Sequence, residues 1–128
     1  MRIEHVALCV RDLERSREFF EKYFAARSSG LYFNPQTGFS SYFLNFEDGS
    51  RLELMSYSDI ADVREKNVHT AGYAHIAFSV GSRGNVLSLT EQLRGDGYRI
   101  VSEARITGDG YFESVIADPE GNLIEITV

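Results

Sequence analysis

The chain has few of the residues and runs that mark secreted and membrane-spanning proteins. It contains a single cysteine, Cys9, so no internal disulfide can form and a reducing compartment is indicated. No apolar run approaches the length of a transmembrane helix. The N-terminus alternates apolar and polar residues instead of joining a basic segment to an apolar one. We therefore expect no membrane span, no signal peptide and a cytoplasmic location.

Positive charge is also in short supply. The chain has 13 Lys and Arg residues against 19 Asp and Glu residues, which gives a net charge of −6. An acidic protein attracts neither nucleic acid nor an anionic membrane surface, so neither is expected as a partner. A small-molecule substrate is compatible with this charge, an anionic one included, because a bound metal ion can reverse the local field.

The residues that are present suffice for a folded domain. Hydrophobic residues make up 43% of the chain and aromatic residues 12%, although tryptophan is absent. This composition argues against disorder, and 128 residues fit one domain. We predict a single domain over residues 1–128.

An internal repeat is the strongest pattern in the sequence. Residues 3–10 (IEHVALCV) match residues 73–80 (YAHIAFSV), with His, Ala and Val coinciding. Residues 43–54 (FLNFEDGSRLEL) match residues 115–126 (VIADPEGNLIEI), with Gly and Glu coinciding. The two matches have nearly the same offset, which predicts a tandem duplication. The expected parts are a first unit at 1–56, a connection at 57–72 and a second unit at 73–128.

Each unit is predicted to start as a strand that leads into a helix. In the first unit Asp12 is the expected N-cap, and Glu14 places negative charge in the first turn. The second helix is expected to run from about Asn85 and to end at Gly95 and Gly97. Further strands are predicted at residues 31–34, 39–46, 50–56, 98–103, 111–118 and 122–128.

Two histidines and two glutamates occupy matching places in the two units. His5 precedes Glu53 by 48 residues, and His75 precedes Glu125 by 50. Side chains alternate along a strand, and the residues that alternate with these four are mostly bulky and apolar. All four therefore point away from the apolar backing. On the face of the histidines the neighbours are small: Ala7, Cys9, Ala77 and Ser79.

Any one of these residues alone is more commonly a polar group on the solvent side of a half-buried strand. Four of them in matching positions favour a shared site. Imidazole and carboxylate groups together bind divalent ions such as zinc, nickel, cobalt, iron or manganese. Two nitrogen and two oxygen donors would leave two positions of an octahedron open. We interpret His5, Glu53, His75 and Glu125 as a divalent-metal site.

These segments resemble the vicinal-oxygen-chelate superfamily, and within it the glyoxalase I (lactoylglutathione lyase) family. The matching segments are residues 3–7, 51–54, 72–77 and 118–125, and the resemblance covers essentially the whole chain. It implies an α+β fold in which tandem βαβββ units form an open, cupped barrel of mixed β-sheet with helices on the outside. It also implies a homodimer and one divalent ion per site, either nickel, cobalt or zinc. The units would meet within one chain or across two chains.

The subfamilies of this superfamily differ in how many protein side chains bind the metal ion. Extradiol dioxygenases and fosfomycin-resistance proteins use three protein ligands, and bleomycin-binding members lack the set. Methylmalonyl-CoA epimerases use four ligands but usually carry Gln at the position of Glu53. The His/Glu/His/Glu set is the glyoxalase pattern.

Two positions depart from the glutathione-using members of that family. Cys9 stands where they generally carry an Arg that pairs with a carboxylate of the thiol, and Tyr57 stands where they often carry Asn. Loss of the Arg–carboxylate contact would remove about 1.5–3 kcal/mol of binding free energy. The resemblance therefore implies the metal chemistry, with glutathione, another thiol adduct or a substrate without a thiol.

The resemblance implies a metal-dependent carbon–sulfur lyase or isomerase. Such an enzyme moves a proton through a metal-bound enediolate of a hemithioacetal or a related enolisable small molecule. Glu125 is the expected base and Glu53 the second candidate. Cys9, Tyr57 and Tyr111 are the candidate substrate contacts. Tyr42 and Phe112 are further candidates for the pocket wall, and His69 is expected to be exposed in the connection.

Two other functions fit the same sequence. One is an epimerase of an acyl thioester, which would use the same proton transfer. The other is a protein that binds and sequesters a small molecule without turning it over. Metal analysis of the purified protein would separate the second from the enzymes.

Overall fold

The structure is a computed structural model that describes residues 3–61 and 72–128. The chain divides into two compact units, Met1–Thr70 and Ala71–Val128. His69 and most of the predicted connection lie outside the described residues.

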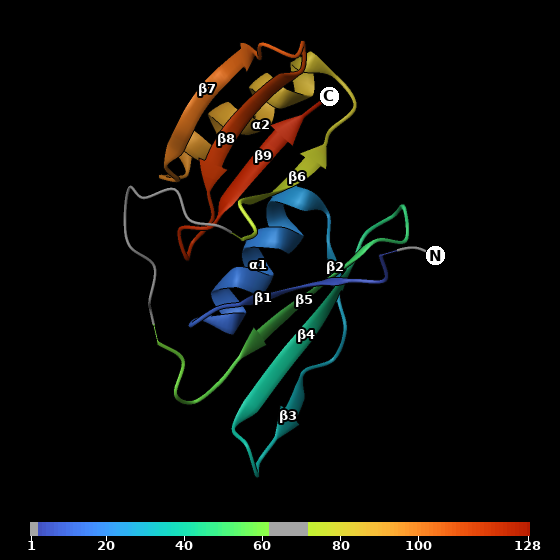
Figure 1. Cartoon of the computed structure of the whole chain (residues 1–128), viewed down its shortest axis with the longest axis vertical. Helices are drawn as coiled ribbons and strands as arrows, with labels where there is room; N and C mark the ends of the chain where they lie inside the picture. The colour runs from blue at the N-terminus through green and yellow to red at the C-terminus, as the bar shows by residue number, and fades with distance from the viewer. Residues whose placement is uncertain (1–2, 62–71) are drawn as a thin grey trace. The chain divides into compact units, whose positions relative to one another are not determined.

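The first unit is a helix packed on a five-stranded mixed sheet (Figure 1). Strand β1 pairs in parallel with β5, and the remaining strand pairs are antiparallel. The order across the sheet is β1-β5-β4-β2, with β3 also paired to β4. The elements are β1 (Val6–Cys9), α1 (Leu13–Phe24), β2 (Arg27–Ser28), β3 (Tyr32–Asn34), β4 (Phe39–Asn45) and β5 (Arg51–Ser56).

The second unit repeats this connectivity with one strand fewer (Figure 1). Its sheet has the order β6-β9-β8-β7, with β6 parallel to β9 and the other pairs antiparallel. The elements are β6 (His75–Ser79), α2 (Arg83–Gly95), β7 (Ile100–Ile106), β8 (Phe112–Ala117) and β9 (Leu123–Thr127). The predicted α+β class and the βαβββ repeat are confirmed.

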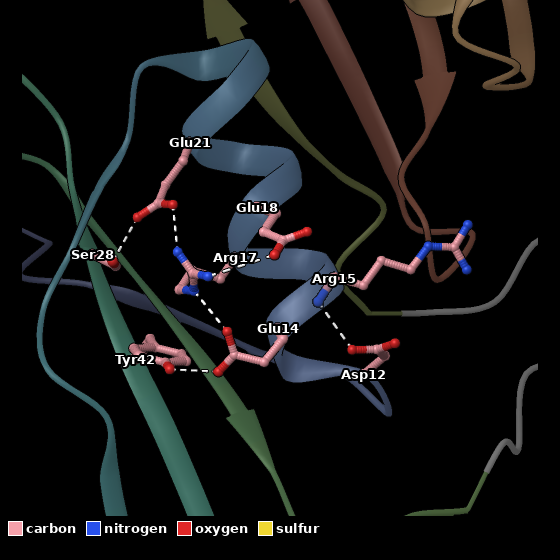
Figure 2. Close-up of polar contacts among 8 residues, drawn as sticks. All are labelled: Asp12, Glu14, Arg15, Arg17, Glu18, Glu21, Ser28 and Tyr42. Carbon is pink, nitrogen blue, oxygen red and sulfur yellow. Dashed lines mark hydrogen bonds and ion pairs between the residues drawn. The ribbon is translucent and has the colours of Figure 1, made fainter.

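Helix α1 begins where the sequence predicts. The Asp12 side chain accepts a hydrogen bond from the Arg15 backbone N–H at 2.9 Å, which satisfies a donor that the first turn leaves free. The helix carries a polar network on one side (Figure 2). In this network Arg17 donates to Glu14 at 2.9 Å and to Glu21 at 2.5 Å.

Helix α2 begins two residues before the predicted start at Asn85. The Ser82 side chain accepts from the Asn85 backbone N–H at 3.1 Å, so Ser82 is the N-cap and the helix begins at Arg83. Asn85 therefore lies inside the first turn, where its side chain donates to Val80 O. The prediction overlooked the serine.

The strands show the predicted alternation between buried apolar and half-exposed polar residues. Leu52 and Leu54 in β5 are 3% and 0% exposed, and Ile124 and Ile126 in β9 are 1% and 0% exposed. Helix α1 packs on β4 and β5, and helix α2 packs on β7, β8 and β9. The burial of these apolar residues thus directs the side chains between them, Glu53 and Glu125, to the opposite face of each sheet.

No helix among residues 3–61 and 72–128 combines the length and the hydropathy that a bilayer crossing requires.

Candidate metal centre

In the first unit the structure brings together the two predicted ligands. Ala7 of β1 is the register partner of Glu53 in β5, and His5 lies two residues before Ala7. His5 directly precedes β1, and the contact of its imidazole with the Glu53 carboxylate places the two side chains on one face as diagonal neighbours. His5 Nε2 lies 3.7 Å from Glu53 Oε2. The side chains are 37% and 16% exposed, so the histidine is open to solvent while the carboxylate is partly sheltered.

The second unit repeats this diagonal with the other two predicted ligands. Ala77 of β6 is the register partner of Glu125 in β9, and His75 lies two residues before Ala77. His75 Nε2 lies 3.4 Å from Glu125 Oε2, and the side chains are 45% and 18% exposed. The two units thus present the same pair of groups from matching places in the repeat, although His75 opens β6 and His5 directly precedes β1.

Each pair has a spacing that suits two ligands of one metal ion. Two donor atoms that each lie about 2.1 Å from an ion are about 3.0 Å apart at a right angle and about 3.4 Å apart at a tetrahedral angle. The observed separations of 3.7 and 3.4 Å need little adjustment to reach these values. Within the described part of the chain no three His, Cys, Asp or Glu side chains form a metal-binding group, so each unit offers a pair.

The His5 imidazole is surrounded by a carboxylate, an aromatic ring and a guanidinium group. Its Nδ1 donates a hydrogen bond to a carboxylate oxygen of Glu4, and Arg51 donates to the other oxygen. These two bonds, that from His5 above all, lower the pKa of Glu4. The Phe43 ring stands edge-on to the imidazole at 5.3 Å, and the Arg51 guanidinium lies 4.3 Å over the Phe43 ring.

Glu113 is a neighbour of the candidate ligand Glu125 that the sequence did not reveal. It lies on β8 opposite Thr127, two residues from the register partner of Glu125, so its carboxyl group is a diagonal neighbour of the Glu125 carboxylate. Burial raises the pKa of Glu113, and the negative charge of Glu125 raises it further. The matching position of the first unit is Ser41, the register partner of Met55. Only the pairing register, which sequence alternation does not give, would have revealed this contact.

The three candidate substrate contacts are all accessible, but they lie in different surroundings. Cys9 is exposed in β1, two residues beyond Ala7 on the face that carries His5. Tyr57 is 40% exposed and packs against Phe39, with ring centroids 5.2 Å apart. Tyr111 is 61% exposed and immediately precedes β8. Their contact with a substrate stays a prediction.

Two of the further candidates for the pocket wall lie on the wrong face. The Tyr42 hydroxyl donates to Glu14 of α1 at 2.5 Å, so this tyrosine lies on the helix-covered side of its sheet. Phe112 alternates with Glu113, and the Arg83 guanidinium of α2 lies 5.1 Å from its ring. Both rings therefore pack toward a helix and away from the His/Glu pairs.

A family comparison is consistent with the repeated fold. The family model of the glyoxalase/bleomycin resistance protein/dioxygenase superfamily matches residues 2–126. The chain belongs to this superfamily. Because the superfamily name covers dioxygenases as well as bleomycin resistance proteins, membership by itself does not set the activity.

Individual members of the superfamily cover nearly the whole chain. A lactoylglutathione lyase of Haemophilus influenzae is 31% identical over 128 residues, which are 98% of this chain and 90% of the relative. The trypanothione-dependent glyoxalase I of Leishmania major has a TM-score of 0.79 at 24% identity, over 99% of this chain and 86% of that one. A glyoxalase family protein of Enterococcus faecalis has a TM-score of 0.82 at 19% identity, over 99% and 97%. The two solved structures support the fold.

Proposed function

We propose that this superfamily member is a metal-dependent lyase or isomerase of the glyoxalase I type. In this proposal His5, Glu53, His75 and Glu125 are the four protein ligands of one divalent ion, either nickel, zinc or cobalt. The pairs belong to one chain or are exchanged between two chains of a homodimer. The observation that carries the proposal is the repeated diagonal, with His–Glu separations of 3.7 and 3.4 Å.

The proposed reaction is the transfer of a proton between adjacent carbons of an enolisable small molecule. A divalent ion in this site would act as a Lewis acid that acidifies the C–H bond beside a coordinated oxygen. A carboxylate of the protein takes the proton from one carbon and returns it to the next. We assign this role to Glu125, with Glu53 as the second candidate. Both carboxylates are more than four-fifths buried, which limits competition from water.

The relatives support a thiol adduct as the substrate class. The Haemophilus relative is named a lactoylglutathione lyase, and the Leishmania structure is described as trypanothione-dependent. Proteins of this fold thus differ in the thiol they use. In this chain Cys9 and Tyr57 replace the usual Arg and Asn of glutathione-using members, so we expect a thiol other than glutathione to be preferred.

The deciding experiment joins metal analysis to a substrate assay. Purified protein is stripped, reloaded with nickel, cobalt or zinc, and given methylglyoxal with glutathione or with other thiols while thioester formation is followed. We expect stoichiometric metal and metal-dependent turnover. Protein that retains no divalent ion would overturn the proposal and favour a protein that sequesters a small molecule.

A single substitution tests the proposed base. Glu125→Gln should lower the turnover rate about 10²- to 10⁴-fold, the usual contribution of a general base, while part of the metal affinity remains. Glu47→Gln, in the exposed turn between β4 and β5, is the matched control and should keep full activity. Full activity of the Glu125 variant would remove this residue from the role.

A further inference from the structure

The two His/Glu pairs differ in what contacts Nδ1 of the histidine, the ring nitrogen that does not face the paired glutamate. Glu4 accepts a hydrogen bond from His5 Nδ1, and Arg51 holds the same carboxylate by its other oxygen. At the matching places of the second unit stand Ala74 and Leu123, neither of which has a side chain that could form such bonds. His75 therefore serves as an internal comparison for the effect of the Glu4 carboxylate on His5.

The local backbone explains how Glu4 reaches its neighbour. Side chains of adjacent residues in a strand point to opposite faces, which would separate Glu4 from His5. Residues 3–5 precede β1, which begins at Val6, so strand alternation does not govern them. Arg51 opens β5 and alternates with Leu52, so it shares the face of Glu53. Its guanidinium is packed on the Phe43 ring, which limits its movement.

We propose that Glu4, held in place by Arg51, is a positioning residue that sets the tautomer and the orientation of His5. This inference rests on the proposed metal site. A neutral imidazole has one nitrogen that donates and one that accepts, whereas an ionised carboxylate only accepts. The bond to Glu4 therefore places the hydrogen on Nδ1 and leaves the lone pair on Nε2. Nε2 is the atom that lies 3.7 Å from Glu53 Oε2, on the side where a metal ion would bind.

The proposed effect acts on metal affinity more than on folding. About half of the Glu4 side chain and a third of the Arg51 side chain are exposed. Ion pairs this open to solvent contribute little to stability. Carboxylates that orient a histidine ligand, in contrast, typically change metal affinity by about 10- to 100-fold when they are removed. His5 is thus the pre-oriented ligand of the two, and His75 the freer one.

Metal affinity is the first test. The full chain is titrated with nickel or zinc in competition with a chromophoric chelator. Glu4→Ala should weaken binding by about 10- to 100-fold. Glu4→Gln keeps an uncharged acceptor, so its metal affinity should lie between that of the unmodified protein and that of Glu4→Ala. Arg51→Met should also weaken metal binding, but by less than Glu4→Ala. Glu47→Ala is the matched control and should bind like the unmodified protein. Equal affinity of the Glu4→Ala variant would overturn the inference while the metal site stands.

The tautomer of His5 gives a second readout that needs neither metal nor turnover. Long-range proton–nitrogen NMR spectra of the metal-free protein at mildly alkaline pH report which ring nitrogen carries the hydrogen. We expect Nδ1–H for His5 in the unmodified protein, its loss in Glu4→Ala, and an unchanged spectrum for His75. Identical His5 spectra in both proteins would contradict the role of Glu4. Unmodified protein that binds no ion would instead overturn the proposed function, and these spectra would still decide whether Glu4 sets the tautomer.

Discussion

At the scale of single residues, a hydrogen bond between Tyr42 and Glu14 joins β4 to helix α1. The Tyr42 hydroxyl donates to Glu14 at 2.5 Å, beside the Arg17 bonds described above (Figure 2). The hydrogen bond from Tyr42, and after it that from Arg17, lowers the pKa of Glu14 below 4.5. The same bond raises the pKa of Tyr42. The tyrosine thus has a structural role in place of the position in the pocket wall that the sequence suggested.

Tyr42→Phe should lower the free energy of unfolding by about 0.5–1.5 kcal/mol near neutral pH, because one hydrogen bond is lost. A carboxyl with a lowered pKa in the fold contributes stability above its unfolded pKa, and this contribution is lost as the pH falls through the folded value. The difference between the two proteins should therefore shrink below about pH 4.5.

Urea denaturation at several pH values measures this effect. Tyr32→Phe, at a ring that is 55% exposed, is the control and should change stability by less than about 0.5 kcal/mol. A difference for Tyr42→Phe that stays constant into acid would mean that the ionised Glu14 does not contribute.

Substitution of Glu113 is expected to increase the free energy of unfolding, whereas Tyr42→Phe is expected to decrease it. In the metal-free protein Glu113→Gln should raise the free energy of unfolding at neutral pH by a few tenths to about 1 kcal/mol, because it removes a like charge beside Glu125. Glu47→Gln is the exposed control and should leave stability nearly unchanged. Denaturation without divalent ions measures both. A loss of stability in the Glu113 variant would show that its contacts are favourable on balance.

At the scale of the elements, a buried polar contact joins helix α2 to β8. The Thr90 hydroxyl donates its hydrogen to Val86 O at 2.6 Å. It therefore accepts from the Ser114 hydroxyl, which lies 2.7 Å away. Thr90 and Ser114 are 2% and 0% exposed, so water cannot replace either partner.

Thr90→Val should cost about 1–3 kcal/mol of unfolding free energy, because the Ser114 hydroxyl stays buried without this acceptor. Adding Ser114→Ala removes the stranded donor and should recover a large part of that loss. A double-mutant cycle by urea denaturation measures the coupling. Additive effects of the two substitutions would contradict the proposed coupling between the two hydroxyl groups.

The sequence revealed the strand faces wherever polar and apolar residues alternate strictly. In β5 and β9 the buried Leu and Ile residues placed both glutamates on the correct face. In β4 the segment 39–45 (FSSYFLN) has aromatic residues on both faces, so the pattern could not tell that Tyr42 points to the helix. Strand β2, with two residues, is too short to show any alternation.

The contacts that surround the histidines could not be predicted for a related reason. Glu4 meets His5 because residues 3–5 lie outside β1, and strand boundaries are uncertain by a few residues from sequence alone. Glu113 meets Glu125 because of the pairing register between β8 and β9. Sequence patterns give the face of a residue, whereas its neighbours across the sheet depend on register.

At the scale of the whole molecule, a metal ion should link the stability of the chain to ligands from both repeats. At a free ion concentration of 100 times Kd, binding adds about 2.7 kcal/mol to the free energy of unfolding. Thermal unfolding with nickel and with excess chelator should show this difference in Tm. His5→Ala and His75→Ala should each remove most of it, because one ion is proposed to use both pairs.

The stoichiometry of bound metal completes this test. One ion per set of four ligands is expected, with Glu47→Ala as a control that keeps it. If the His75→Ala variant retained half of the metal and half of the change in Tm, each pair would bind an ion independently. That outcome would contradict the shared site.

The two repeats keep the same diagonal although the histidine precedes the glutamate by 48 residues in one and by 50 in the other. The additional residues are taken up between the strands, where the chain tolerates changes of length. A single residue inserted within β5 or β9 would instead turn the carboxylate toward the helix and replace it by a leucine or isoleucine. Insertions in the loops therefore leave the His/Glu pairs in place, whereas an insertion within β5 or β9 removes the carboxylate from its pair.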